Sequence, residues 1–211
     1  MENDTPNKIK ISKEIIATLP IETFPGKIVV IDNERDADNA VLQLNNERII
    51  GFDTETRATF KKRKSNHVAL IQLSTHDTCY LFRINRIGFT PAIKNLLENE
   101  SLLKVGISLK DDFCMLSRLN GGQFIPRNFI ELQKFVKKYN IEDQSLQKIY
   151  GIVIGKKISK GQRLSNWEAD HLTENQQLYA ATDAWSCIKI YEVLKSGKFK
   201  SPIYKIQPSS L

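Results

Sequence analysis

Two carboxylates one residue apart are the side chains in this sequence best placed to do chemistry. The run Ile49–Glu55 (IIGFDTE) passes from apolar residues into Asp53 and Glu55. Because alternate side chains of a β-strand share one face, Asp53 and Glu55 project together while Thr54 points away. Two such acids repel each other, so one holds a proton unless a cation lies between them. Oxygen ligands on a rigid strand end suit Mg²⁺ or Mn²⁺, although a solvated strand end gives the same short pattern.

A second acidic position is Asp111-Asp112, at the start of a helix expected over residues 108–119. This helix follows a strand expected over 102–107, so both acids lie near a positive helix N-terminus and near the carboxyl ends of the sheet strands. Acidic residues are also common at helix starts that have no function. Asp111 and Asp112 are therefore candidate metal ligands only in combination with the other acids.

The third position is Tyr179 and Asp183, four residues apart on one face of a long helix expected over 174–196. The buried side of this helix is expected to hold Leu178, Ala181, Trp185 and Ile188. An acid beside such an apolar stripe needs a partner, because an unpaired buried carboxylate is costly. A metal ion shared with Asp53 and Glu55 would supply that partner.

The elements that must position these side chains follow from hydrophobic periodicity. Strands are expected at 27–32, 49–54, 67–74, 78–84 and 102–107, and helices at 12–18, 33–44, 91–98, 108–119, 129–138, 145–150 and 174–196. Thr173 and Gln176 predict a capping box at the start of the last helix. Consecutive strands favour antiparallel pairs, and helix-linked strands favour parallel neighbours. The sequence thus predicts an α/β fold with a mixed sheet covered by helices.

Length and composition fit one ordinary domain with a sizeable core. Of the 211 residues, 41% are hydrophobic and 26% charged, which is typical of a soluble globular protein. No apolar run approaches the roughly 20 residues of a membrane helix, and no secretory signal is evident. Three widely spaced cysteines favour a reducing, cytoplasmic location. We expect an N-terminal extension at 1–26, a functional domain at 27–196 and a C-terminal tail at 197–211.

The chain is basic, with a net charge of +7 and a pI of about 9.2. Carboxylates concentrated within a basic protein suggest a metal with a polyanion around it. Basic runs occur at 61–64 and 156–163, and the first is also compatible with a nuclear-import signal or a solvated loop tip. The residues that we expect to contact nucleic acid are Lys62, Arg63, Lys157 and Arg163.

Three segments together resemble the exonuclease motifs of the DEDD superfamily of 3′–5′ exonucleases, in the subtype with tyrosine in motif III. They are Phe52–Glu55, Val105–Leu116 and Leu172–Ala184 (LTENQQLYAATDA), the last preceded by Ser-Asn-Trp at 165–167. Val68–Leu73 (VALIQL) resembles the strand that follows motif I. The resemblance covers about residues 27–195. It is closest to the exonuclease domain of Werner syndrome helicase and its bacterial relatives, with ribonuclease D more distant.

The resemblance implies a ribonuclease-H-like sheet with three antiparallel strands plus parallel strands. It implies that Asp53, Glu55, Asp112 and Asp183 bind two divalent cations, Mg²⁺ or Mn²⁺, and that Tyr179 orients the attacking water. The activity expected is two-metal hydrolysis that releases nucleoside 5′-monophosphates from DNA or RNA 3′ ends.

Two positions decide how the family pattern is carried over. Leu178 occupies the place where the histidine subtype has histidine, which excludes that subtype. Motif II has two adjacent acids, and we choose Asp112 because it stands four residues before Leu116, the family's spacing. Adjacent helix residues point about 100° apart, so only one of Asp111 and Asp112 is expected to reach the site.

Two alternatives stay open: RNA 3′ trimming like that of ribonuclease D, and a non-catalytic nucleic-acid-binding module of the same fold. The full set of acids with the tyrosine favours the active enzyme. We expect no membrane partner, and any helicase or processivity partner is expected to be a separate chain.

Overall fold

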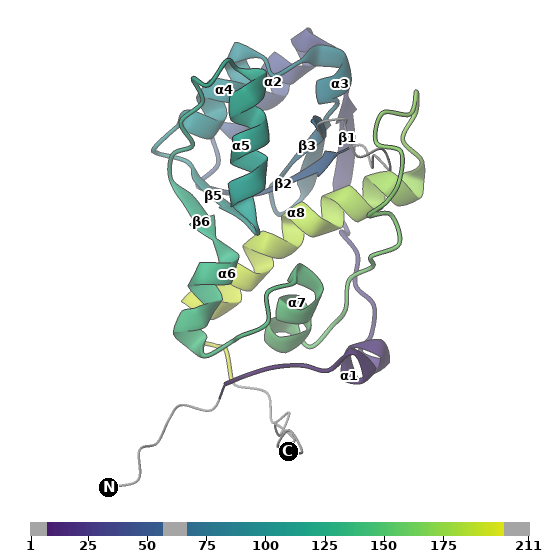
Figure 1. Cartoon of the computed structure of the whole chain (residues 1–211), viewed down its shortest axis with the longest axis vertical. Helices are drawn as coiled ribbons and strands as arrows, with labels where there is room; N and C mark the ends of the chain where they lie inside the picture. Colours follow the sequence, from purple (N-terminus) through teal and green to yellow (C-terminus); the bar gives the residue numbers. More distant parts are fainter. Residues whose placement is uncertain (1–7, 57–66, 201–211) are drawn as a thin grey trace, which may run out of the picture.

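The computed structural model describes residues 8–56 and 67–200, which form a six-stranded sheet flanked by helices (Figure 1). The strand order is β1-β4-β3-β2-β5-β6. The strands are β1 (Lys27–Ile31), β2 (Ile49–Thr56), β3 (Val68–Ser74), β4 (Thr78–Phe82), β5 (Leu103–Gly106) and β6 (Phe129–Glu131). β2, β3 and β4 pair antiparallel, whereas β1 with β4, β2 with β5 and β5 with β6 pair parallel. The predicted mixed sheet is confirmed.

Helices cover both faces of the sheet. Four lie on the side drawn uppermost in Figure 1, namely α2 (Glu34–Leu44), α3 (Ile84–Ile87), α4 (Pro91–Glu98) and α5 (Leu109–Leu119). The other side carries α8 (Glu174–Lys195) and α7 (Leu146–Ile154), with α1 (Lys13–Thr18), α6 (Leu132–Phe135) and the 3-10 helix η1 (Val136–Tyr139) around them. In the described part of the chain, no helix combines the length and the hydropathy needed to cross a membrane.

Helix starts follow the capping signals of the sequence. The Asn33 side chain accepts from the Asp36 backbone N–H at 3.0 Å, and the Thr90 side chain caps α4, whose first residue is a proline. The predicted capping box is present, since Thr173 Oγ1 accepts from the Gln176 N–H while the Gln176 amide accepts from the Thr173 N–H. These caps fix where α8 begins, and therefore where its functional residues lie along the sheet.

One expected helix is partly wrong. Residues 129–131 form strand β6 rather than the start of a helix over 129–138, and α6 and η1 follow it. β6 pairs parallel with β5 through Phe129 opposite Lys104 and Glu131 opposite Gly106. A three-residue edge strand is too short to show a period of two, so hydrophobic periodicity does not detect it. The short helix α3 was not predicted either.

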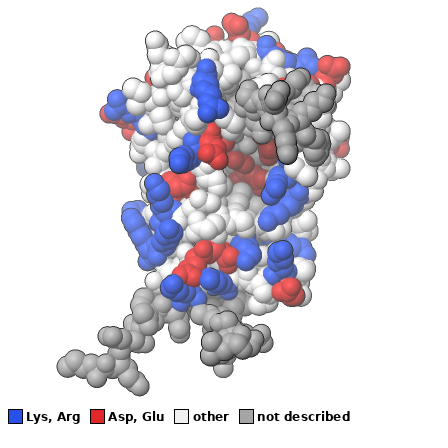
Figure 2. All heavy atoms as spheres, viewed as in Figure 1, with Lys and Arg blue, Asp and Glu red and all other residues white. Residues whose placement is uncertain are grey.

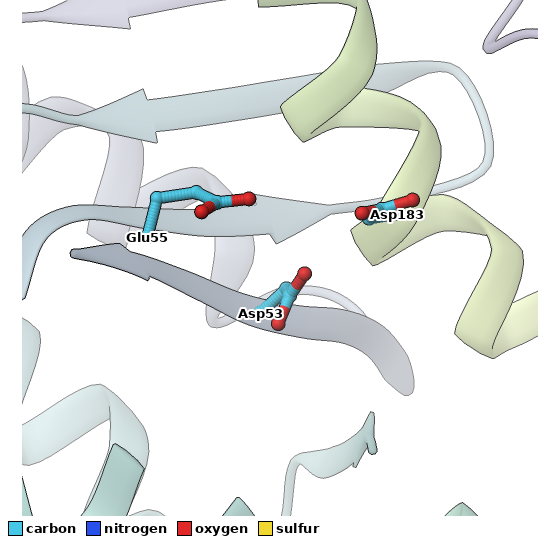
Figure 3. Close-up of side chains that lie close together, drawn as sticks. All are labelled: Asp53, Glu55 and Asp183. Carbon is cyan, nitrogen blue, oxygen red and sulfur yellow. The ribbon is translucent and has the colours of Figure 1, made fainter. Parts of the chain in front are cut away.

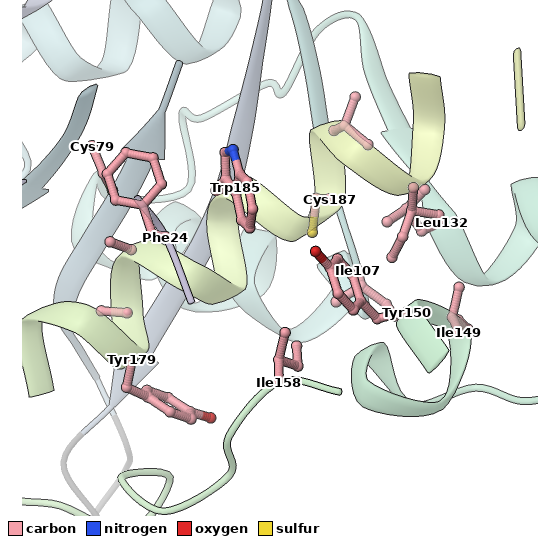
Figure 4. Packing of buried hydrophobic residues seen from close by; sticks show 14 of the residues in the cluster. Phe24, Cys79, Ile107, Leu132, Ile149, Tyr150, Ile158, Tyr179, Trp185 and Cys187 are labelled. Carbon is pink, nitrogen blue, oxygen red and sulfur yellow. The ribbon is translucent and has the colours of Figure 1, made fainter. Parts of the chain in front are cut away.

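Helix α8 is buried on every side between Tyr179 and Ile188, whereas the sequence indicated a single apolar stripe. Its second side is covered by the segment before β1 (Figure 4). The Phe24 N–H donates to Thr182 Oγ1 at 3.0 Å, and the Phe24 ring meets the Trp185 ring edge-on at 5.8 Å. Residues of the expected N-terminal extension thus help to hold α8, while the domain boundaries themselves stay a prediction.

A partly buried carboxylate ties the same segment to α7 and α8. Glu22 accepts hydrogen bonds from the Tyr150 hydroxyl, from Lys156 Nζ at 2.7 Å and from Lys189 Nζ at 2.9 Å. Burial acts to raise the pKa of Glu22, but hydrogen bonds from Lys156, Tyr150 and Lys189 outweigh it and lower the pKa to about 2. The charged form of Glu22 therefore stabilises the fold.

Candidate active site

The structure brings three of the sequence-predicted acids together. Asp53 and Glu55 lie on one face of β2, Asp183 lies on α8, and one oxygen from each falls within 4.8 Å of the others. Figure 3 shows the three side chains directed toward a common space. Only 9% of Glu55 and 8% of Asp183 is exposed. Oxygen ligands this close together in a shielded place form a donor set suited to a hard divalent cation.

Two glycines let the helices approach β2 closely enough to form this set. A Cβ on Gly51 would lie 1.9 Å from the Ala184 carbonyl oxygen, so only glycine allows α8 to lie this near to β2. A Cβ on Gly106 would lie 2.9 Å from the Phe52 carbonyl oxygen and 2.5 Å from Leu109 Cδ2, at the start of α5. Glycine inside a strand often marks such close approaches. Gly51 stands in the run 49–55 and Gly106 in motif II, but their role in close packing was not predicted from the sequence.

Asp112 reaches the site from the first turn of α5. The Thr54 hydroxyl donates to Asp112 Oδ1, so Thr54, which the sequence placed on the face away from Asp53, holds the fourth acid. Asp111 is exposed. Within the described residues, Asp112 does not belong to the group of acids whose oxygens lie within 4.8 Å, but its charge helps to raise the pKa of Asp53. The geometry thus favours Asp112 over Asp111 as the acid that faces the site.

Burial and mutual repulsion hold protons on these acids. Burial, followed by the charges of Asp183 and Asp112, raises the pKa of Glu55 to about 9. Burial raises the pKa of Asp183 to about 7 and that of Asp112 to about 6, and together with the neighbouring acids it raises the pKa of Asp53 well above its ordinary value. Each shift opposes the charged form, which a divalent cation stabilises. The charged forms of these acids are therefore stable together only when a metal ion compensates their charge.

Tyr179 lies beside the acids with its hydroxyl protonated. Burial and the charge of Asp183 raise its pKa, and the hydroxyl also hydrogen-bonds to Asp183. The fully buried Trp167 ring packs on the Tyr179 ring, with centroids 6.1 Å apart and planes inclined at 35°. A tyrosine held in this way presents a fixed hydroxyl oxygen to the space that the acids face.

Two arginines, which sequence analysis did not single out, support that arrangement from β4 and α3. Arg83, only 2% exposed, donates to the carbonyl oxygens of Ala169 and Asp170, and Arg86 Nη2 donates to the Asp170 carbonyl at 2.6 Å. These three hydrogen bonds hold the loop that carries Trp167. The sequence does not reveal that Arg83 binds this loop, because the carbonyl oxygens that it contacts lie more than 80 residues further along the chain.

Gln72 is a further polar residue that sequence analysis did not single out. It lies directly opposite Asp53 in the β2–β3 register, so the two side chains share one face of the sheet. Gln72 is fully buried, and neither of its amide atoms has a hydrogen-bond partner within the described structure. Because Gln72 shares a sheet face with Asp53, its amide is a polar group beside the carboxylate site whose hydrogen bonds are not made by the described residues. In the sequence, the one feature that could have pointed to Gln72 is that it is a polar residue inside the apolar run of β3.

The expected nucleic-acid contacts differ in their surroundings. Arg163 is exposed, and its charge opposes part of the rise in the pKa of Glu55. Lys160 does the same for Asp183, so both cations lie near the acids. Lys157 instead donates its ammonium to the Ala17 carbonyl. The remaining two, Lys62 and Arg63, lie outside the described residues.

Comparison with solved structures finds the same fold. The EXO domain of Aedes aegypti Nibbler superposes with a TM-score of 0.74 at 22% identity, covering 83% of this chain and 91% of that one. Escherichia coli RNase D, described as an exoribonuclease involved in structured RNA processing, gives a TM-score of 0.72 at 20% identity, covering 82% and 45% of the two chains. At these identities the likeness shows the fold alone, which is the predicted ribonuclease-H-like arrangement.

Sequence comparison identifies the family. The mouse bifunctional 3′-5′ exonuclease/ATP-dependent helicase WRN is 33% identical over 208 residues, covering 90% of this chain. The chain spans only 14% of that protein, and 24–25% of the mosquito Exonuclease mut-7 homolog and of the Drosophila melanogaster Exonuclease 3′-5′ domain-containing protein 2. The 3′-5′ exonuclease family model matches residues 28–197. With the motifs, the fold and the carboxylate site in agreement, this chain belongs to the 3′–5′ exonuclease family.

Proposed function

We propose that this protein removes nucleotides from nucleic-acid 3′ ends by hydrolysis assisted by two divalent cations, Mg²⁺ or Mn²⁺. The observation that carries the proposal is the convergence of Asp53, Glu55 and Asp183 within 4.8 Å, with the pKa of each raised. Asp112 completes the proposed ligand set. When bound, such cations stabilise charge on the phosphoryl group and activate water at neutral pH.

The side chains of the site have separable tasks in this proposal. Asp53 lies close to both Glu55 on its own strand and Asp183 on α8, so its carboxylate would be within reach of each cation. Tyr179 keeps its proton and donates it in a hydrogen bond to Asp183, which fixes the direction of the hydroxyl, and the hydroxyl oxygen accepts a hydrogen bond from the attacking water. Arg163 and Lys160 provide positive charge at the edge of the acids, where the phosphate of the terminal nucleotide enters.

The substrate is tested by comparing strands that differ only in sugar and in pairing. Single-stranded DNA, recessed duplex DNA and RNA, each labelled at the 5′ end, are incubated with Mg²⁺, Mn²⁺ or EDTA. We expect a ladder that shortens from the 3′ end with either metal, nucleoside 5′-monophosphates as products, and no hydrolysis in EDTA. Folded protein that binds the strands but leaves them intact with both metals would support the non-catalytic module instead. If RNA is shortened and neither DNA substrate is, the result would support RNA 3′ trimming like that of ribonuclease D.

A pair of variants tests the division of tasks. Tyr179→Phe removes one positioning hydrogen bond, so we expect turnover to fall by about 10²-fold without a change in the Mn²⁺ concentration required. Asp183→Asn replaces a charged ligand by a neutral amide, so its residual rate is expected to recover partly at high Mn²⁺. Metal titrations of the rate at saturating substrate separate the two. A fully active Tyr179→Phe variant would leave Tyr179 as a packing residue of α8.

A further inference from the structure

Three segments that are distant in the sequence bring exposed lysines together on one end of the molecule. Ile9 forms a β-bridge with Ile141, the Tyr139 hydroxyl donates to the Leu194 carbonyl at 2.9 Å, and the Tyr139 and Phe199 rings lie 6.1 Å apart. We call the resulting surface the lysine face. Its lysines are Lys8, Lys10, Lys13, Lys134, Lys137, Lys138, Lys195, Lys198 and Lys200.

The lysine face carries most of the net charge of the chain. Its three segments, 8–14, 132–144 and 192–200, contain nine lysines and four acids, a net charge of +5 against +7 for the whole protein. Glu142 pairs with Lys8 at 2.6 Å and with Lys10 at 3.0 Å. In the described structure the other seven lysines make no ion pair. Figure 2 shows Lys and Arg side chains gathered on the lower part of the molecule, where α6 and α7 lie. Uncompensated positive charge at this density favours a polyanion as partner.

The same surface is hollowed. A cavity of about 640 Å³ is lined by Lys8, Lys10 and Lys137 together with Asn140, Glu142 and Gln144. Ammonium and amide groups are the donors that phosphate oxygens accept from. The one carboxylate in the lining, Glu142, is already held by Lys8 and Lys10, and Gln144 Nε2 donates to the Glu142 carbonyl oxygen at 3.1 Å, which leaves Lys137 and the Asn140 amide available. The cavity thus suits a segment of phosphodiester backbone.

The lysine face begins next to the carboxylate site. Glu131, just before α6, accepts from the backbone N–H groups of Ser108 and Leu109 at 3.1 and 2.8 Å, and Gln133 Nε2 donates to Ser108 Oγ at 2.8 Å. These bonds join the start of α6 to the start of α5, the helix that carries Asp112. The lysines of α6 and η1 therefore lead away from the place where a 3′ end would be hydrolysed.

We propose that the lysine face binds the phosphate backbone of the substrate strand several nucleotides before its 3′ end. This inference rests on the proposed exonuclease function. It adds a second contact region on the side of the site formed by α6 and η1, separate from the cations of residues 156–163. Long strands engage both regions, whereas very short strands reach only the carboxylate site.

The test compares substrate lengths in a variant with Lys134, Lys137 and Lys138 changed to Gln. Hydrolysis of 5- and 20-nucleotide oligothymidylate, or oligouridylate if the substrate panel selects RNA, is followed across a range of salt concentrations. Each lost phosphate contact on a single strand lowers the salt slope of affinity by about 0.7, so three contacts lower it by about 2. We expect KM for the 20-nucleotide strand to rise by about tenfold or more at 0.1 M salt, with the 5-nucleotide KM and both kcat values retained.

A matched control separates local contacts from net charge. Changing Arg35, Arg48 and Arg118 to Gln removes the same charge from exposed positions on or near α2 and at the end of α5. This control is expected to leave the length dependence as in the wild type. The proposal is overturned if KM for the two lengths changes equally, if neither changes, or if the control matches the lysine variant. Absence of hydrolysis by the wild type at either length would instead refute the proposed function.

Discussion

Replacing Gly51 by alanine is expected to separate Asp183 from Asp53 without touching either side chain. The added Cβ would lie 1.9 Å from the Ala184 carbonyl oxygen and 2.7 Å from the carbonyl carbon. An ordinary contact begins near 3.4 Å, so the two backbones must move apart by about 1.5 Å at the residue next to Asp183. Neither atom is the end of a flexible side chain, so α8 itself has to shift.

The size of the effect follows from that displacement. A misplacement of about 1 Å at a catalytic centre can cost about 10²-fold in rate, and forcing extra volume into a packed core costs about 1–3 kcal/mol. For Gly51→Ala we expect at least about a 10²-fold loss of exonuclease rate and weaker Mn²⁺ binding, in a protein that still folds. The assays are single-turnover hydrolysis at saturating Mn²⁺, calorimetric titration with Mn²⁺, and thermal unfolding.

Gly26→Ala is the matched control. Its Cβ would lie 2.2 Å from the Asp77 carbonyl oxygen, a comparable backbone clash just before β1, and 2.6 Å from Phe24 Cζ, at the end of a side chain that can give way without moving the backbone of α8. We expect a similar loss of stability with near-normal Mn²⁺ affinity and rate. If Gly51→Ala keeps a rate within threefold of the wild type, or if Gly26→Ala loses activity equally, then close packing of α8 on β2 does not set the site.

Three further outcomes follow from the same structure. Asp112→Asn should reduce the exonuclease rate by orders of magnitude, whereas Asp111→Asn should keep most of it, because only Asp112 is held by Thr54; rates of the two purified variants decide. In EDTA, the melting temperature should fall as the pH rises from about 5 to 9. The pKa values of Asp112, Asp183 and Glu55 are raised to about 6, 7 and 9, so over this range the folded state holds more protons than the unfolded state. Added Mn²⁺ should restore the melting temperature at the upper end of the range. A metal-free melting temperature that rises over this range would contradict the burial of the acids. Glu22→Gln should lower the free energy of unfolding by about 3 kcal/mol at pH 7, a difference that is complete above the unfolded pKa and shrinks as the pH falls toward 2; urea titrations at pH 7 and pH 3 measure it, and an equal loss at both values would show that the charge of Glu22 contributes nothing.

Sequence reasoning succeeded where local rules decide the structure. The period of two in β2 placed Asp53 and Glu55 together, and the capping box fixed the start of α8 and so the register of Tyr179 and Asp183. It did not succeed where a contact joins distant parts of the chain. β6 needs β5 beside it, the role of Arg83 needs the loop at 169–170, and neither partner is visible in the local pattern. The packing of the segment around Phe24 on α8 was likewise not predicted, because it joins residues 158 positions apart.

The position of the acids shows how the site is kept in an unfavourable state until a cation binds. Four carboxylates whose pKa values are raised by burial, and for Asp53 and Glu55 also by the neighbouring acids, would drift apart on mobile loops. Here two of them project from a central strand, and the other two are brought in by helices that pack directly on backbone at Gly51 and Gly106. Burial of α8 on all sides, with Glu22 holding the segment that covers it, removes the freedom to relieve the repulsion by moving. Core packing thus keeps the carboxylates close together, and their mutual repulsion is reduced only when they bind protons or metal ions.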